Sequence, residues 1–155
     1  MNERIAAQHQ ELHQALEFFE ASVESPFVPG EIERWIAAVE LAWNRLLPTL
    51  NWLITVRHPD EFAEIRQEDQ ELIRRVQQMR QEDAAIDSAA VELEQRISLI
   101  ETAISNIEPD EVQVRTTLEN FVDDAIGLII RIRKQELAVR TWLLEALNRD
   151  RGTVD

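Results

Sequence analysis

The sequence predicts an all-α protein, an up-down-up-down four-helix bundle whose third and fourth helices are long. Segment 60–108 contains neither Gly nor Pro before Pro109, and its apolar residues recur at steps of three and four. A second row with the same spacing occupies segment 114–146. Residues that break helices gather in three places, which divide the chain into four parts. Because steps of three and four place side chains on one face of a helix, each part is expected to bury one face against the others.

The first helix is expected over residues 3–24. It ends before Ser25-Pro26 and Pro29-Gly30, because proline cannot continue a helix and glycine favours turns. Its predicted inward row is Ile5, His9, Leu12, Leu16, Phe19 and Val23.

The second helix is expected over residues 31–57. Glu31 and Glu33 suit the positive end of the helix dipole at its start. Pro48 lies inside this segment and should bend it, because a proline removes one backbone donor. The predicted inward row is Trp35, Val39, Ala42, Leu46, Leu50 and Leu53.

The third and fourth helices are expected over residues 59–107 and 109–149. Segments 58–61 and 108–111 share one pattern, a Pro followed by two acidic residues. This pattern is typical of a turn with Pro at the first position of the helix that follows. Both helix starts are predicted on this basis.

The lengths of the predicted helices indicate a dimer. At a rise of about 1.5 Å per residue, the third and fourth helices reach roughly 60 to 70 Å, whereas the first two reach roughly 30 to 40 Å. The hairpin over residues 86–128 should then project with its apolar seam only partly covered, and we expect a homodimer packed through it. An alternative is that the third helix breaks near residues 82–85, where an acid interrupts the row, and folds back.

Composition excludes several kinds of function. The 155 residues, 45% of them hydrophobic, suit a single domain over residues 1–155. The formal net charge of -14 repels phosphate backbones and anionic membranes, so neither a nucleic acid nor a membrane is an expected partner. There is no Cys, which excludes disulfides and thiolate chemistry and suits a cytoplasmic protein. The longest apolar stretch, residues 46–56, is shorter than the about 20 residues that a bilayer requires.

Polar residues at inward positions are the candidates for a site. His9 falls on the inward row of the first helix, and Asp69 and Gln135 fall on those of the third and fourth. Because a buried carboxylate needs a partner, we predict a buried polar layer of these three residues. His9 and His13 lie one helical turn apart, where two imidazoles can share a metal ion. With Asp69 they form an alternative candidate metal site.

Other polar residues have simpler interpretations. His58 is expected at a solvated turn before Pro59, and Asp83 is expected to be solvated or to break its helix. The chain has no Gly-rich phosphate loop, no supported Ser/His/Asp set and no Glu-x-x-His pair. We therefore expect no catalytic residues and no enzyme activity.

Three stretches of the chain resemble the bacterial hemerythrin-like (HHE) proteins. They are IAAQHQEL at residues 5–12, RHP at 57–59 leading into IRQEDQEL at 65–72, and LLEALNRD at 143–150. Members of this family are four-helix bundles that hold two irons with inward histidines and carboxylates, for oxygen binding, sensing or iron handling. The resemblance implies the same hemerythrin-like bundle.

The resemblance also implies that most metal ligands are lost. His9 stands at the histidine position of the first helix, whereas Asp69 stands where the third helix would offer a histidine. Gln135 and Val139 stand where the fourth helix would offer a histidine and a carboxylate. The plausible positions of the second helix carry no donor. We therefore expect no cofactor and a core that folds without metal.

These observations lead to one expected function and two alternatives. We expect a non-catalytic, metal-free binding or scaffolding module that forms a homodimer. The first alternative is a reduced metal-binding or oxygen- and redox-sensing protein that holds iron or another divalent metal at His9, His13 and Asp69. The second is that the four tryptophans border a pocket for a small apolar molecule.

Overall fold

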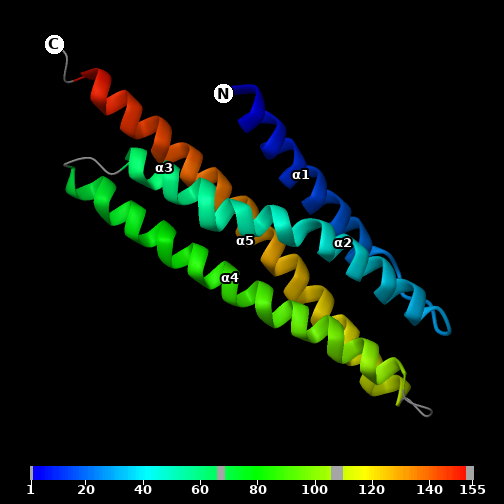
Figure 1. Cartoon of the computed structure of the whole chain (residues 1–155). Coiled ribbons are helices and arrows are strands. Elements are labelled where there is room, and N and C mark those ends of the chain that lie inside the picture. Colours follow the sequence, from blue (N-terminus) through cyan, green and yellow to red (C-terminus); the bar gives the residue numbers. More distant parts are fainter. Residues whose placement is uncertain (1, 66–68, 106–109, 153–155) are drawn as a thin grey trace. The chain divides into compact units, whose positions relative to one another are not determined.

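The computed structural model describes residues 2–65, 69–105 and 110–152. In chain order they form α1 (Asn2–Glu24), α2 (Ile32–Trp52), the π-helix η1 (Leu53–Arg57), α3 (His58–Ile65), α4 (Gln70–Ile104) and α5 (Glu111–Gly152) (Figure 1). The described ranges contain no strand, so the predicted all-α class is confirmed. Among these helices, none combines the length and the low polarity needed to traverse a bilayer.

A tight turn joins α1 to α2, as predicted from the prolines and glycine at this point. The backbone N–H of Glu31 donates to the carbonyl oxygen of Val28 at 2.9 Å. Gly30 has a φ of 88°, a conformation that residues with a side chain rarely adopt. Trp35, one turn into α2, donates from Nε1 to the carbonyl oxygen of Ser25 at 2.9 Å, which ties the turn to the helix.

The predicted turn at residues 58–61 is wrong, because helical structure continues through it to Ile65. α2, η1 and α3 follow one another without interruption over residues 32–65. In the wide turn of η1, the backbone N–H of His58 donates to the carbonyl oxygen of Leu53. A π-turn shifts the register of the backbone hydrogen bonds, which lets the helix include Pro59 although this residue has no N–H.

The predicted third helix is therefore divided differently from the expectation. α3 ends at Ile65 and α4 begins at Gln70, and residues 66–68 lie outside the described ranges. α4 runs through residues 82–85 without a break, so the alternative of a break there is wrong. α5 begins at Glu111, beside its predicted start, where Asp110 Oδ1 accepts from the backbone N–H of Val112 at 3.2 Å. Residues 106–109 lie outside the described ranges.

The helices form two compact units. The first unit consists of Met1–Leu50 and Ala89–Ile129, and the second of Asn51–Ser88 and Ile130–Asp155. The single domain over residues 1–155 stays a prediction.

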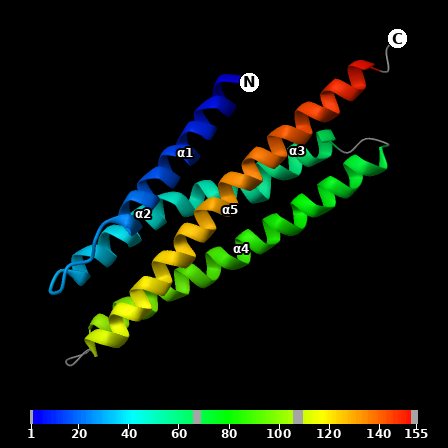
Figure 2. The same cartoon turned by 180° about the vertical axis from the view of Figure 1, so that it is seen from behind.

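The first unit has an apolar and aromatic core. Both views show α1 beside the first part of α2, and the end of α4 beside the start of α5 (Figures 1 and 2). Phe19 of α1 lies against Trp43 of α2 with ring centroids 5.3 Å apart. Trp35 of α2 meets Phe121 of α5 edge-on, with centroids 6.2 Å apart. Aromatic contacts therefore join α1 to α2 and α2 to α5.

This packing covers the seam of the α4–α5 hairpin. Most of its apolar residues are at most 3% exposed, whereas Ile104 and Val114 near its tip are half-buried. The buried ones include Leu93, Ile97, Ile100, Leu118, Phe121 and Ala125. The expectation that this seam is only partly covered is wrong, because α1 and α2 of the same chain pack in the same unit. The homodimer through the hairpin stays a prediction, although most of this seam is covered within the chain itself.

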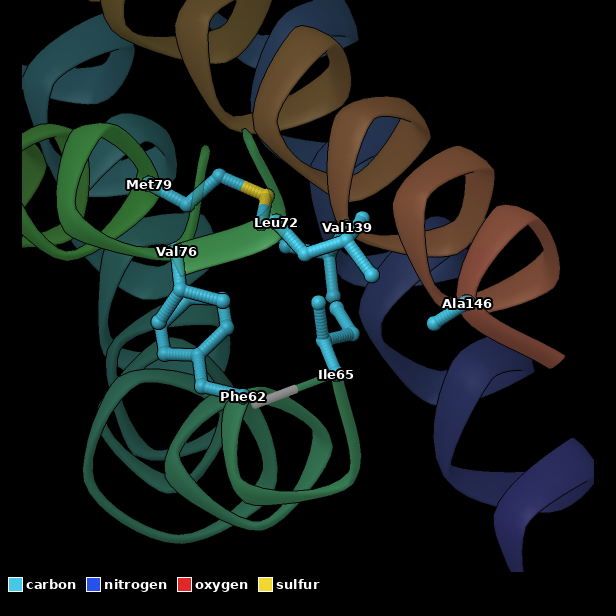
Figure 3. Close-up of a cluster of buried hydrophobic side chains, with 7 residues drawn as sticks. All are labelled: Phe62, Ile65, Leu72, Val76, Met79, Val139 and Ala146. Carbon is cyan, nitrogen blue, oxygen red and sulfur yellow. The ribbon is translucent and has the colours of Figure 1, made fainter. Parts of the chain in front are cut away.

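The second unit has a core formed by three helices. Figure 3 shows side chains from α3, α4 and α5 that converge on one another. They are Phe62, Ile65, Leu72, Val76, Met79, Val139 and Ala146, each at most 5% exposed. One helical turn from this core, each of the three helices places a polar residue in the interior; these are His58, Asp83 and Gln135.

Candidate functional site

The interior of the second unit contains a network of buried charged and polar side chains. His58 at the start of α3 is 0% exposed, and Asp83 of α4 and Gln135 of α5 are each 5% exposed. Buried ionic groups are rare and costly unless they are paired. This network is therefore the candidate functional site.

His58 lies at the centre of the network, between two carboxylates. Its Nδ1 is 2.9 Å from both Oδ1 and Oδ2 of Asp83. Its Nε2 is 2.7 Å from Oε1 of Glu136 on α5. A neutral imidazole can donate from only one nitrogen, whereas ionised carboxylates only accept. The geometry therefore indicates a protonated His58 that donates from both nitrogens.

The pKa of His58 agrees with this protonation state. Burial by itself lowers the pKa, because it disfavours the charged imidazole. The hydrogen bonds to Asp83 and Glu136, and the charges of these carboxylates, act in the opposite direction and raise the pKa of His58 to about 9. At neutral pH the residue is accordingly a cation.

Two further side chains hold the carboxylates in place. Gln135 Nε2 donates to Asp83 Oδ1 at 2.9 Å and to the carbonyl oxygen of Met79 at 2.7 Å. Arg57, the last residue of η1, donates from Nε to Oε1 of Glu61 at 2.7 Å. Its Nη1 lies 3.9 Å from Oε2 of Glu136. The network thus alternates cations with carboxylates and joins η1, α3, α4 and α5 in one layer.

This arrangement has little capacity for acid–base or metal chemistry. With a proton on each ring nitrogen, His58 offers no lone pair to a substrate or to a metal ion. Asp83 and Glu136 lie at opposite nitrogens of the ring, so the three residues do not converge on one point as ligands would. Within residues 2–65, 69–105 and 110–152, no group of three or more His, Cys, Asp or Glu could hold a metal ion.

Of the predicted polar layer, Gln135 belongs to this network. Asp69 instead precedes α4, and its Oδ1 accepts from the backbone N–H of Glu71 at 2.8 Å as a helix cap. Its other oxygen pairs with Nη1 of Arg149 on α5, and these contacts lower the pKa of Asp69, the Arg149 hydrogen bond most strongly. His9 is half-buried on α1, in the first unit.

The alternative metal site gains no support from the geometry. His13 is an exposed residue whose Nε2 lies 3.1 Å from Oε1 of Glu17, one turn along α1. Asp69 is occupied by the cap and the Arg149 ion pair in the second unit. The described residues therefore place His13 and Asp69 in separate local interactions.

The expectations for His58 and Asp83 are wrong, because both are buried and paired. The error follows from the predicted turn at Pro59, which placed His58 in solvent. A signal against that turn exists in the sequence: His58, Phe62 and Ile65 are spaced by four and three residues, so a helix that includes His58 places it on the same face as Phe62 and Ile65. For Asp83, the signal is its position in an otherwise unbroken heptad row.

A pocket in the first unit differs from the predicted tryptophan pocket. It has a volume of about 500 Å³ and lies between the α1–α2 turn, the end of α4 and the start of α5. Phe27, Ile32, Ile104 and Leu118 supply apolar lining. No tryptophan is among its lining residues, and Trp35 and Trp43 are buried in the core instead.

No protein-family model, curated protein or solved structure matches this chain. Among the described residues, the buried network around His58 is the most informative group about function.

Proposed function

We propose that this protein is a non-catalytic, metal-free helical bundle of the hemerythrin-like type that serves as a binding or scaffolding module. The observation that carries the proposal is the state of His58. Both of its nitrogens donate to carboxylates of the same chain, so neither nitrogen is available to a substrate or a metal ion. The network acts as a structural layer, and the exposed surfaces of the helices are left for binding.

The physical role of such a layer is to fix how helices are aligned. Apolar contacts have no preferred direction, whereas a buried charge must meet its partner within hydrogen-bond distance. His58 reaches Asp83 on α4 and Glu136 on α5, so a shift of any of the three helices along its axis would separate a buried ion pair. A scaffold that presents a binding surface benefits from this fixed alignment.

Two observations support a hemerythrin-like bundle without its iron site. The three stretches that resemble this family lie in helical parts of the chain, apart from Asp69, which precedes α4, and residues 66–68, which lie outside the described ranges. Asp69, at the position where the family would offer a metal ligand, caps a helix and pairs with Arg149. Both oxygens of this carboxylate are therefore engaged by groups of the protein itself.

Metal analysis of the protein purified from its own host tests the proposal. We expect less than stoichiometric iron, manganese or zinc, and a thermal midpoint that a chelator does not change. The variant His9→Gln is the control, because it removes the one histidine that matches a family ligand position. Its midpoint should respond to chelator as the wild type does. Stoichiometric metal that is lost in His9→Gln would instead support the alternative of a metal-binding sensor.

A further inference from the structure

α5 carries a second apolar row, on the side opposite to its buried row. In the second unit, α5 buries Ile132, Gln135, Val139 and Ala146. Ile130, Leu137 and Leu144 recur every seven residues and, at a rotation of about 100° per residue, point away from that row. They are 45%, 63% and 56% exposed, and Leu147 beside them is 47% exposed. Single exposed leucines are ordinary, but three apolar residues repeated at one heptad position form a narrow apolar stripe along the helix, which a partner helix can cover.

Basic residues flank this row. Lys134 and Arg140 are exposed and lie on either side of Leu137 around the helix. We call the set Ile130, Lys134, Leu137, Arg140, Leu144 and Leu147 the α5 outer face. None of these positions is acidic, although the whole chain has 30 acidic and 16 basic residues. The α5 outer face is therefore a local basic surface on an acidic protein.

The acidic residues of the same stretch of α5 do not neutralise this face. Glu136 is part of the buried network, where its Oε1 accepts from His58. Glu145 accepts from Arg149 Nε at 3.0 Å, on the side of the helix where Arg149 also meets Asp69. The positive charges of Lys134 and Arg140 are therefore available to pair with carboxylates of a partner protein.

Charge argues against a second copy of this chain as that partner. Two copies that met through the α5 outer face would present the same patch to each other. Lys134 and Arg140 of one copy would then approach Lys134 and Arg140 of the other, with no acidic residue in the face to separate them. Like charges brought together in an interface disfavour the complex.

A membrane surface also fits poorly. Helices that lie on membranes bury a broad apolar face that often includes aromatic residues. The α5 outer face is narrow and contains no aromatic residue. The aromatic residue nearest in sequence, Trp142, is half-buried and lies against the guanidinium of Arg75, 4.7 Å from its ring centroid.

We propose that the α5 outer face binds an amphipathic helix of another protein whose apolar row is flanked by Asp or Glu. The proposal rests on the proposed function of a binding module and names the chemistry of its partner. Ile130 to Leu147 span roughly 26 Å, enough for about five turns of a docked helix. Apolar side chains of the partner would cover Leu137 and Leu144, and its carboxylates would pair with Lys134 and Arg140.

Two synthetic helical peptides test this proposal with the full-length protein. Both carry the same leucine row, flanked by Glu in one peptide and by Lys in the other. We expect the Glu peptide to bind more tightly in a fluorescence anisotropy titration. The net charge of -14 attracts the Lys peptide at long range, so a preference for the Glu peptide must come from the local basic surface.

Three variants assign the binding to this face. The double variant Leu137→Gln/Leu144→Gln should weaken binding of the Glu peptide by about tenfold or more. Leu99→Gln is the matched control, because Leu99 is 67% exposed on α4 in the first unit, and it should bind as the wild type does. Lys134→Glu/Arg140→Glu should reverse the preference toward the Lys peptide. All substituted residues are exposed, so circular dichroism should show unchanged helicity.

Several results would overturn the proposal. They are no binding of the Glu peptide, equal or tighter binding of the Lys peptide, and unchanged binding by both double variants. Association with phosphatidylserine vesicles in place of the Glu peptide would assign the face to membranes. Wild-type dimers that Leu137→Gln/Leu144→Gln dissociates would assign it to self-association. None of these results changes the metal content, so failure here is distinguishable from failure of the proposed function.

Discussion

The two units bury their helices with different chemistry. The centre of the first unit is filled by rings, with Phe19 against Trp43 and Trp35 against Phe121. The centre of the second unit combines an apolar cluster with an ionic layer around His58. Both use residues at heptad spacing on long helices, so the spacing alone does not distinguish them.

The two units differ in how strictly their interior contacts require a particular partner. Apolar contacts depend mainly on area and volume, and they tolerate exchange of one hydrophobic side chain for another of similar size. The ionic layer depends on direction and distance, because each buried charge needs its own partner. We therefore expect the second unit to be more sensitive to loss of a single polar group, and the first to loss of volume.

The largest effect is expected for Asp83→Leu. The substitution removes the acceptor of His58 Nδ1 and leaves the buried imidazolium with one carboxylate, which should cost about 3 to 5 kcal/mol of unfolding free energy. Urea denaturation measures this loss. Asp124→Leu in the first unit is the control, because Asp124 is 62% exposed in its pair with Arg96, and should cost less than about 1 kcal/mol. Equal losses in the two variants would contradict the comparison.

A pH titration of stability should show the next largest effect. The folded pKa of His58, about 9, lies above its ordinary value of 6.5, so protonation favours the folded state. This contribution is fully present below pH 6.5 and is lost as the pH rises through 9, by roughly 3 kcal/mol in total. This contribution of His58 is the part of the stability difference between the wild type and His58→Gln that changes between pH 6.5 and pH 9 and above. A difference that stays constant with pH would mean that His58 is not a buried cation.

Gln135→Met tests the layer without removing a charge. It keeps the approximate volume but removes the amide that donates to Asp83 and to the carbonyl oxygen of Met79. A loss of about 2 kcal/mol is expected, because hydrogen bonds to charged buried groups contribute more than neutral ones. Urea denaturation measures the loss of unfolding free energy. The control is Leu128→Met, because Leu128 is a buried apolar residue of α5 in the first unit. Similar losses in both variants would show that volume rather than hydrogen bonding is measured.

The smallest effect is expected for Trp43→Phe. Trp43 is 1% exposed, and its Nε1 has no hydrogen-bond partner among the described residues. The lost volume destabilises the core, whereas removal of the buried N–H offsets part of that loss, so about 1 kcal/mol is expected. Thermal unfolding measures it. A loss as large as that of Asp83→Leu would contradict the view that the first unit tolerates apolar exchange.

The structure confirms two predictions from the sequence, the buried faces of the long helices and the buried position of Gln135. The rows from Leu72 to Ile100 and from Leu118 to Ala146 are largely buried, because helical periodicity places them on one face. Gln135 was identified as a polar residue in an apolar row, and it is buried and bonded. The error for His58 arises at Pro59, where the π-helix before it keeps the helix continuous and His58 lies in the interior.

The sequence by itself determined the helical class, the buried faces and the existence of polar exceptions among them. These follow from local geometry, because a helix of fixed rotation per residue sets which side chains share a face. Only the tertiary structure decided that His58 meets Asp83 and Glu136, and that Asp69 meets Arg149. Those pairings depend on how far each helix is shifted along its axis within its unit, and periodicity is unchanged by such a shift.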